Sequence, residues 1–394
     1  APFFLRGSAG LAGALKTYRR GVASLRLGPD GLRIELSAAA AGAPGLSELA
    51  GFPLKAPGRV DSDPVAARSS SGAPMAYWTS GRSVVAMDLS SGASSTLELD
   101  DKGYVVLDRN RGRLEAVWVV SGRGTVYRAN DKLEALPGFP ILTGYAVSAP
   151  PTAVVDTLYI PVSDEPAVLI VDAGGQTLLS DALHARSRSA PAASSWGVAV
   201  LPRSFDSQLY LLDPDGKLLA GWPVALDGIA GAAPVFAGAD SASGGMVAAV
   251  TEDGILGAWK ADGSSVGGFP TQLYGVFDTA LAWAPGWRSF FLVSTDGTLW
   301  RVGSDGFMAG SLPLKRGAAA DSSILAFDGN GDGREELYVA GGGDALYAYS
   351  GDLTPLPGYP VSGTGLPAFV DVDGDGRADL VVRGADHTIH AYND

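Results

Sequence analysis

Acidic residues recur at alternate positions in two short stretches near the end of the chain. In the second stretch, VDVDGDGRADL, the residues Asp371, Asp373, Asp375 and Asp379 occupy positions 1, 3, 5 and 9. Like charges at this spacing repel one another unless water or a counter-ion screens them. Oxygen ligands in this number suit Ca²⁺, whereas Mg²⁺ prefers a smaller octahedron and usually keeps several waters. The pattern therefore predicts a calcium-binding loop, with a solvated acidic turn as the alternative.

The first stretch, FDGNGDGREEL, has the same spacing with an amide in place of one carboxylate. Its oxygen-bearing side chains belong to Asp328, Asn330, Asp332 and Glu336. At position 7 of the two loops we expect Arg334 and Arg377 to contribute main-chain carbonyl oxygens. About two calcium ions are therefore predicted, one in each loop, with structural rather than catalytic roles because protein oxygens would leave little open coordination.

An EF-hand is the main rival interpretation of these loops, but it requires a bidentate glutamate at position 12 and flanking helices. Position 12 is Val339 in one loop and Val382 in the other. The flanking segments, such as ILAF, LYVAG and LVVRG, are short apolar runs of the kind found in strands. Each loop is therefore expected to join two strands.

Two repeated signals describe the elements that must position these loops. The first is a small residue, an aromatic residue and proline, found at Gly51–Pro53, Gly138–Pro140, Gly221–Pro223, Gly268–Pro270 and Gly358–Pro360, with Ser311–Pro313 as a divergent copy. The second is a short strand followed by a polar turn, whose eight copies align Val85, Tyr127, Leu169, Tyr210, Gly257, Trp300, Tyr347 and His390. Both signals recur at intervals of about 44 residues.

A unit of this length, with short apolar runs separated by Asp-Gly or similar turns, is long enough for a four-stranded antiparallel sheet. One such sheet cannot bury both of its faces, whereas eight packed around an axis can. A β-helix would repeat at about half this period or less, and separate sandwiches would not repeat at this length. The sequence therefore predicts an all-β fold, an eight-bladed β-propeller over residues 46–394.

Residues 1–45 differ in character, with a net charge of +4 against −17 for the remainder. The segment GLAGALKTYRR is compatible with a short basic helix, and the residues on either side of Pro29-Asp30-Gly31 alternate as in a β-hairpin. The run SAAAAGAPG would be a linker. This extension either packs on the propeller or forms the end of a larger upstream domain.

The last repeat, TIHAYND, ends at Asp394 without the outer strand that follows the other copies. The segment Leu46–Pro53 has the signature of an outer strand and precedes the strands of the first blade. We therefore expect residues near Ser47–Ala50 to pair antiparallel with the third strand of the last blade, because an unpaired strand edge would otherwise remain.

Composition limits the classes of function. A formal charge of −13 argues against nucleic-acid binding, and the absence of cysteine excludes disulfides and thiolate sites. The chain has no apolar run long enough for a transmembrane segment.

Residues with catalytic potential are few. His387 and His390, three apart in an expected strand, would point to opposite faces, and His184 stands alone. No Walker motif occurs, and the Gly-x-Ser-x-Gly match at Gly263–Gly267 follows a turn that leads into an expected outer strand, not into the helix that a nucleophile elbow requires. The eight tryptophans share no blade position, which argues against repeated sugar sites but leaves open a single site in the central funnel.

The loop pattern, the lead-in segments AAPVFA, SAPPTA and GLPAFV, and the period together resemble the FG-GAP or VCBS repeats of calcium-binding propellers. Turns such as YLLDPDG and YAYSGD resemble the pyrroloquinoline-quinone-type propellers, whose members include an eight-bladed lipoprotein of outer-membrane protein assembly. These resemblances imply calcium that stabilises a blade, an extracytoplasmic setting and a non-catalytic protein-binding or assembly scaffold. A polysaccharide lyase or carbohydrate-binding propeller is the alternative, followed by a quinoprotein dehydrogenase.

Overall fold

The computed structural model describes residues 21–28, 31–38, 46–110, 113–202, 204, 207–238, 244–278, 280–314, 323–341 and 343–393. The chain divides into two compact units, residues 1–45 and 46–394. In the first unit, β1 (Gly21–Gly28) and β2 (Gly31–Ala38) form an antiparallel hairpin in which Gly28 pairs with Gly31. The helix expected at residues 10–20 and most of the expected linker lie outside the described residues.

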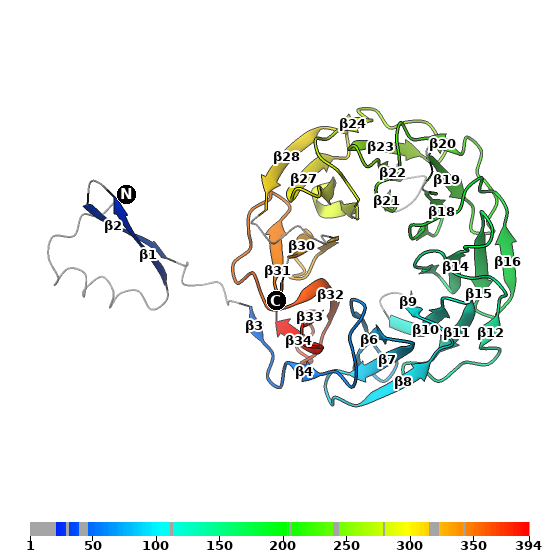
Figure 1. Ribbon diagram of the computed structural model, residues 1–394, viewed down its shortest axis with the longest axis horizontal. Coiled ribbons are helices and arrows are strands. Elements are labelled where there is room, and N and C mark those ends of the chain that lie inside the picture. The colour runs from blue at the N-terminus through cyan, green and yellow to red at the C-terminus, as the bar shows by residue number, and fades with distance from the viewer. Residues whose placement is uncertain are drawn as a thin grey trace. The chain divides into compact units, whose positions relative to one another are not determined.

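The second unit is an eight-bladed β-propeller, which confirms the predicted fold (Figure 1). Blade 1 contains β5 (Val65–Arg68), β6 (Pro74–Ser80), β7 (Ser83–Asp88) and β8 (Ser94–Glu98). Blade 2 contains β9 (Gly103–Asn110), β10 (Arg113–Ser121), β11 (Thr125–Ala129) and β12 (Ile141–Leu142). Blade 3 contains β13 (Thr152–Val154), β14 (Thr157–Pro161), β15 (Val168–Asp172) and β16 (Thr177–Ser180).

The next three blades repeat this antiparallel order. Blade 4 contains β17 (Ala192–Ser194), β18 (Gly197–Val200), β19 (Gln208–Leu212) and β20 (Val224–Ala225). Blade 5 contains β21 (Val235–Ala237), β22 (Met246–Val250), β23 (Ile255–Lys260) and β24 (Thr271–Gln272). Blade 6 contains β25 (Ala282–Ala284), the short 3-10 helix η1 (Pro285–Trp287), β26 (Ser289–Val293), β27 (Thr298–Gly303) and β28 (Met308–Pro313).

The last two blades depart from the four-strand pattern. Blade 7 has three strands, β29 (Ile324–Phe327), β30 (Glu336–Ala340) and β31 (Leu346–Ser350). In the described residues that follow β31, where a fourth strand was expected, the chain forms two isolated bridges with β31 instead. They join Leu346 to Val361 and Tyr349 to Pro355. Blade 8 is built from β32 (Thr364–Val370), β33 (Asp379–Arg383) and β34 (Thr388–Asn393), to which the start of the propeller adds two further strands.

The ring closes through β3 (Ser47–Glu48) and β4 (Leu54–Lys55), which both pair antiparallel with β34 (Figure 1). Ser47 lies opposite Asn393, and Leu54 lies opposite Ile389. The expected strand near Ser47–Ala50 is thus two short strands, interrupted by the Gly-Phe-Pro turn. The hydroxyl of Ser47 donates a 2.8 Å hydrogen bond to the Asn393 side chain, which adds a polar contact between the first and last strands.

Eight clusters of buried apolar residues form the core within the described part of the propeller, and each lies between two adjacent blades. Alternate residues of one strand enter different clusters: Leu158 and Ile160 of β14 face blade 2, whereas Tyr159 faces blade 4. Both faces of each blade are therefore buried, which explains why the strands are continuous apolar runs rather than alternating ones. Trp78 and Trp118 are completely buried in these clusters, as packing residues.

The two repeated signals contact each other between blades. The glycines of the five intact small-aromatic-Pro motifs all have positive φ, and the five aromatic-Pro peptide bonds that follow them are the cis bonds of the described residues. A Cβ atom on Gly268 would overlap the main-chain oxygen of Asp305, and one on Gly306 would overlap that of Gly268. The motif of blade 5 thus packs directly on the Asp-Gly turn of blade 6. The divergent copy at Ser311–Pro313 instead continues as part of β28.

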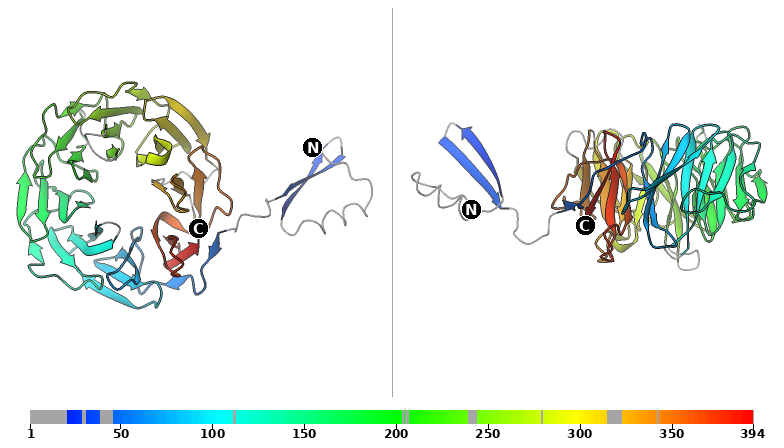
Figure 2. Two further views of the ribbon diagram at one scale, coloured as in Figure 1. Left: turned by 180° about the vertical axis from the view of Figure 1, so that it is seen from behind. Right: turned by 90° about the horizontal axis from the view of Figure 1, so that it is seen from below.

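In the edge-on view of Figure 2 the strands of the propeller run from one face of the ring to the other. Because successive strands of a blade are antiparallel, the first-to-second and third-to-fourth connections share one face, and the other connections share the opposite face. Both acidic loops are first-to-second connections and therefore lie on the same face of the ring.

Candidate metal centre

The second acidic loop joins β32 to β33, and its side chains converge. Ligand oxygens of Asp371, Asp373 and Asp375 all lie within 4.8 Å of one another. Backbone N–H groups hold all three of these carboxylates: Gly374 donates to Asp371 at 2.7 Å, Asp375 donates to Asp373 at 3.0 Å, and Arg377 donates to Asp375 at 2.8 Å. The loop therefore gathers three negative charges on one side of a tight coil, with hydrogen bonds that fix their orientation.

Asp379, the fourth carboxylate of this loop, is only 2% exposed. Its Oδ2 accepts a 2.7 Å hydrogen bond from the Val372 backbone N–H. Burial raises the pKa of Asp379 above its usual value, while the backbone N–H groups of Val372 and Asp373 oppose the rise, and the charges of Asp373 and Asp375 add to it. A bound divalent cation would offset both the burial and the repulsion. These residues therefore fit the predicted calcium ion.

Arg68, at the end of β5 in the first blade, contacts this loop from across the blade interface. Its guanidinium lies 2.6 Å from Oδ2 of Asp371 and donates to the Asp371 main-chain oxygen at 3.0 Å. The loop of the last blade is thus tied to the first blade through a residue that the sequence pattern did not single out.

The first acidic loop joins β29 to β30 and is held differently. Asn330 donates through its side-chain nitrogen to Glu336 at 2.9 Å, and its Oδ1 accepts from the Asp332 N–H at 2.8 Å. Both oxygens of Asp328 accept backbone N–H groups, from Asp332 and Gly333. Among the described residues, only the second loop brings together three acidic, histidine or cysteine side chains at ligand distances. The first loop offers the same kinds of oxygen but fewer charges.

Blade 6 supports the first loop through Trp287 in η1. The indole Nε1 donates a 2.9 Å hydrogen bond to the Glu335 main-chain oxygen, and the Glu335 carboxylate accepts from the Gly286 N–H at 2.9 Å. The guanidinium carbons of Arg301 and Arg334 lie 5.1 and 5.0 Å from the centre of the Trp287 ring, within the range of cation–π attraction. Trp287 has no repeat partner in the sequence, and therefore periodicity could not identify this role.

His390 lies between a hydroxyl and a carboxylate, as a catalytic histidine would. Its Nδ1 is 2.6 Å from Glu48 on β3, and its Nε2 is 3.0 Å from Thr388. The Thr388 hydroxyl, however, donates to Asp386 at 2.6 Å, and its proton is therefore not directed at the imidazole. The Glu48–His390 pair instead links the closing strand to the last blade.

The other two histidines lie outside such an arrangement. His387 was expected in a strand but has a φ of 63° and lies in the turn before β34, because histidine tolerates the left-handed conformation that this turn requires. Its Nδ1 accepts a 3.3 Å hydrogen bond from the Val60 N–H. His184 is exposed beside Tyr210, with 5.9 Å between the ring centres.

The fold and the loops define an eight-bladed β-propeller with acidic strand-connecting loops in its last two blades. Residues 328–382, which contain both loops, match the FG-GAP-like repeat family. This match confirms the predicted resemblance to FG-GAP repeats for that segment, and the arrangement of the blades confirms the eight-bladed propeller.

Solved structures share the fold at low sequence identity. BamB from Moraxella catarrhalis matches with a TM-score of 0.61 and 12% identity over 89% of this chain and 100% of its own. Sqt1 from Saccharomyces cerevisiae matches with a TM-score of 0.63 and 11% identity over 89% of this chain and 99% of its own. The computationally designed Ika8 protein matches with a TM-score of 0.60 and 16% identity over 87% of this chain and 100% of its own.

A comparison with curated proteins found no match. Within the described residues, no helix has the length and apolar character needed to cross a bilayer.

Proposed function

We propose that this protein is a calcium-stabilised propeller that acts as a non-catalytic, extracytoplasmic scaffold for binding another protein. The observation that carries the calcium part is the convergence of Asp371, Asp373 and Asp375 beside the buried Asp379. Each calcium ion in the FG-GAP-like segment would bind within one loop and leave the rest of both faces of the ring free. Extracellular and envelope compartments supply calcium at concentrations that such a loop requires.

Exposed apolar side chains support the protein-binding part. Tyr274 and Val276, between β24 and β25, are 75% and 53% exposed. Phe307 is 73% exposed in the turn before β28, on the opposite face of the ring. Aromatic residues of this kind are typical of protein interfaces. The formal charge of −13 favours a basic partner surface.

Calcium titration by calorimetry is expected to show about two sites and to raise the melting temperature. At a hundredfold excess over the Kd, a site that exists only in the folded state stabilises the protein by about 2.7 kcal/mol. Asp373→Ala combined with Asp332→Ala should abolish both effects. Asp352→Ala, which alters an acidic turn outside the loops, is the matched control and should retain them. Binding of two calcium ions by the double variant would disprove the assignment of the loops.

When the immobilised full chain is incubated with an envelope extract in the presence of calcium, it should retain a protein partner. Because Tyr274 and Val276 are the exposed apolar residues of one loop, their joint replacement by serine should reduce capture if their face is the docking face. The matched control replaces Phe307 and Met308 by serine on the opposite face. Failure of the unaltered chain to retain any protein above a tag-only control would contradict the scaffold function.

A further inference from the structure

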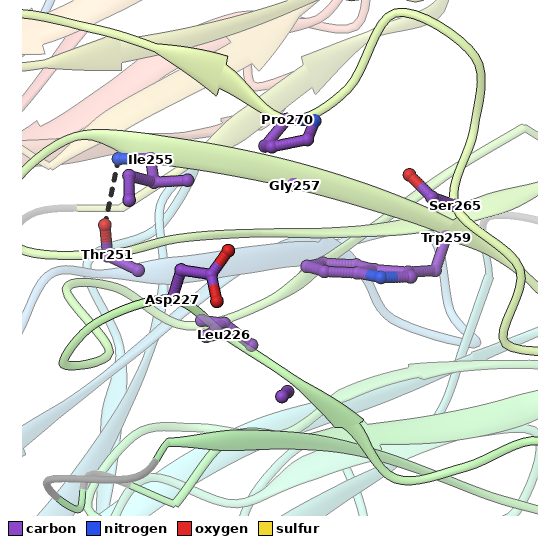
Figure 3. Close-up of a pocket in the computed structure, with 9 residues that line it drawn as sticks. Leu226, Asp227, Thr251, Ile255, Gly257, Trp259, Ser265 and Pro270 are labelled. Carbon is purple, nitrogen blue, oxygen red and sulfur yellow. Dashed lines mark hydrogen bonds between the residues drawn. The ribbon is translucent and has the colours of Figure 1, made fainter.

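A pocket of about 190 Å³ lies between blades 4 and 5, outside the acidic loops (Figure 3). Ala225 and Asp227 line it from blade 4, and Thr251, Ile255 and Trp259 line it from blade 5. Figure 3 shows the flat indole of Trp259 and the side chain of Asp227, which both line the pocket. Two adjacent blades thus contribute an aromatic ring and a carboxylate to the lining of one pocket.

Space for the indole ring comes from a missing side chain in the repeat. Gly257 occupies the aligned third-strand position at which the other seven copies of the repeat carry a side chain. Gly257 and Trp259 are two residues apart in β23 and therefore share a face of the strand. A Cβ atom on Gly257 would overlap the Trp259 ring. In blade 5, therefore, the Trp259 ring occupies the space beside β23 that a side chain at position 257 would otherwise fill.

The polar groups of the pocket discriminate between classes of ligand. Among the described residues, the Asp227 carboxylate has no hydrogen-bond or ion-pair partner, and no Lys or Arg lines the pocket. The Thr251 hydroxyl is already engaged, because it donates to Asp253 at 2.5 Å and accepts from the Ile255 N–H at 2.9 Å. An anion would be repelled, and a sugar would find few free hydrogen-bonding groups. A cation would gain both the carboxylate and the electron-rich indole face.

An exposed apolar loop adjoins the pocket. The backbone N–H of Leu273 donates to Gly254 at 2.8 Å, and that of Phe277 donates to Glu252 at 2.9 Å. These bonds hold the loop that carries Tyr274 and Val276 against the turn that separates Thr251 from Ile255. A macromolecule that covers this loop would lie next to the turn whose flanking residues Thr251 and Ile255 line the pocket, whereas a free small amine would leave the exposed Tyr274 uncovered.

We propose that the pocket between Asp227 and Trp259 binds a basic side chain, lysine or arginine, of the protein partner. This inference rests on the proposed scaffold function and adds the chemistry by which one face would recognise its partner. The ammonium or guanidinium group would pair with Asp227 and lie against the Trp259 ring.

The test uses the full chain labelled with 5-fluorotryptophan and ¹⁹F NMR, with the Trp259 resonance assigned by its loss in Trp259→Phe. The probes are Nα-acetyl-lysine methylamide and Nα-acetyl-arginine methylamide, with the uncharged norleucine analogue and methyl glucoside as comparisons. At least one basic probe should shift the Trp259 resonance, and added salt should weaken its binding. Asp227→Asn should weaken binding tenfold or more, whereas Asp262→Asn, at an exposed turn of blade 5, should not.

Equal shifts with the norleucine analogue, an unaffected Asp227→Asn variant, or a response to methyl glucoside alone would each overturn the proposal. Affinity capture separates it from the scaffold function. Capture of a partner equally by the unaltered chain and by Asp227→Asn would reject the pocket as a recognition site and leave the scaffold function in place. Binding of the basic probes without any captured partner would reject the scaffold function and leave a cation-binding pocket.

Discussion

Removal of residues 1–55 is expected to lower the melting temperature of the propeller sharply or to cause aggregation, whereas removal of residues 1–45 should leave it folded. The longer deletion removes β3 and β4 and exposes the edge of β34. It also removes Leu49, Phe52 and Leu54, which pack against the cluster between blades 8 and 1. Even partial burial of three such side chains contributes about 3 kcal/mol.

Thermal unfolding followed by circular dichroism, with light scattering in parallel, measures this difference directly. The shorter deletion is the matched control because it removes the other compact unit and no strand of the ring. If both truncated chains melt at the same temperature, the pairing of β3 and β4 with β34 is not what holds the ring closed.

Gly268→Ala is expected to destabilise the propeller far more than Gly51→Ala. Both glycines occupy the first position of the small-aromatic-Pro motif with a φ of 92°, and both variants therefore incur the cost of a left-handed alanine, about 1–2 kcal/mol. Only at Gly268 does the added methyl group also overlap the neighbouring blade, at the Asp305 main-chain oxygen. A methyl group at Gly51 would meet no atom within 4 Å beyond its chain neighbours. Relieving that overlap should cost about 1–3 kcal/mol more.

Chemical denaturation of the two variants, compared with the unaltered chain, gives the two losses in stability. Equal losses would mean that contact between the motif and the next Asp-Gly turn contributes nothing beyond backbone conformation. A larger loss at Gly268 would explain why the two sequence signals recur in step, because each then supplies one side of the same contact between blades.

The blades and the acidic loops could be predicted because their determinants are local. A strand, its turn and the next strand are adjacent in sequence, and the period therefore gave both the number of blades and the position of each loop. Likewise, the convergence of Asp371, Asp373 and Asp375 follows from alternate positions in one tight coil. The strand at Leu54–Lys55 and the three-stranded blade 7 were not predicted, because short edge pairings depend on the neighbouring chain more than on their own residues.

The sequence by itself thus determined an acidic chain of eight repeated sheets with two acidic loops, and it indicated which segment would close the ring. Only the tertiary structure decided which side chains meet between blades. Arg68 reaches Asp371 from 303 residues away, Trp287 supports the loop of the next blade, and Asp227 and Trp259 form one pocket. The physical reason is that a period fixes backbone spacing, whereas contacts across an interface depend on how two complete sheets pack face to face.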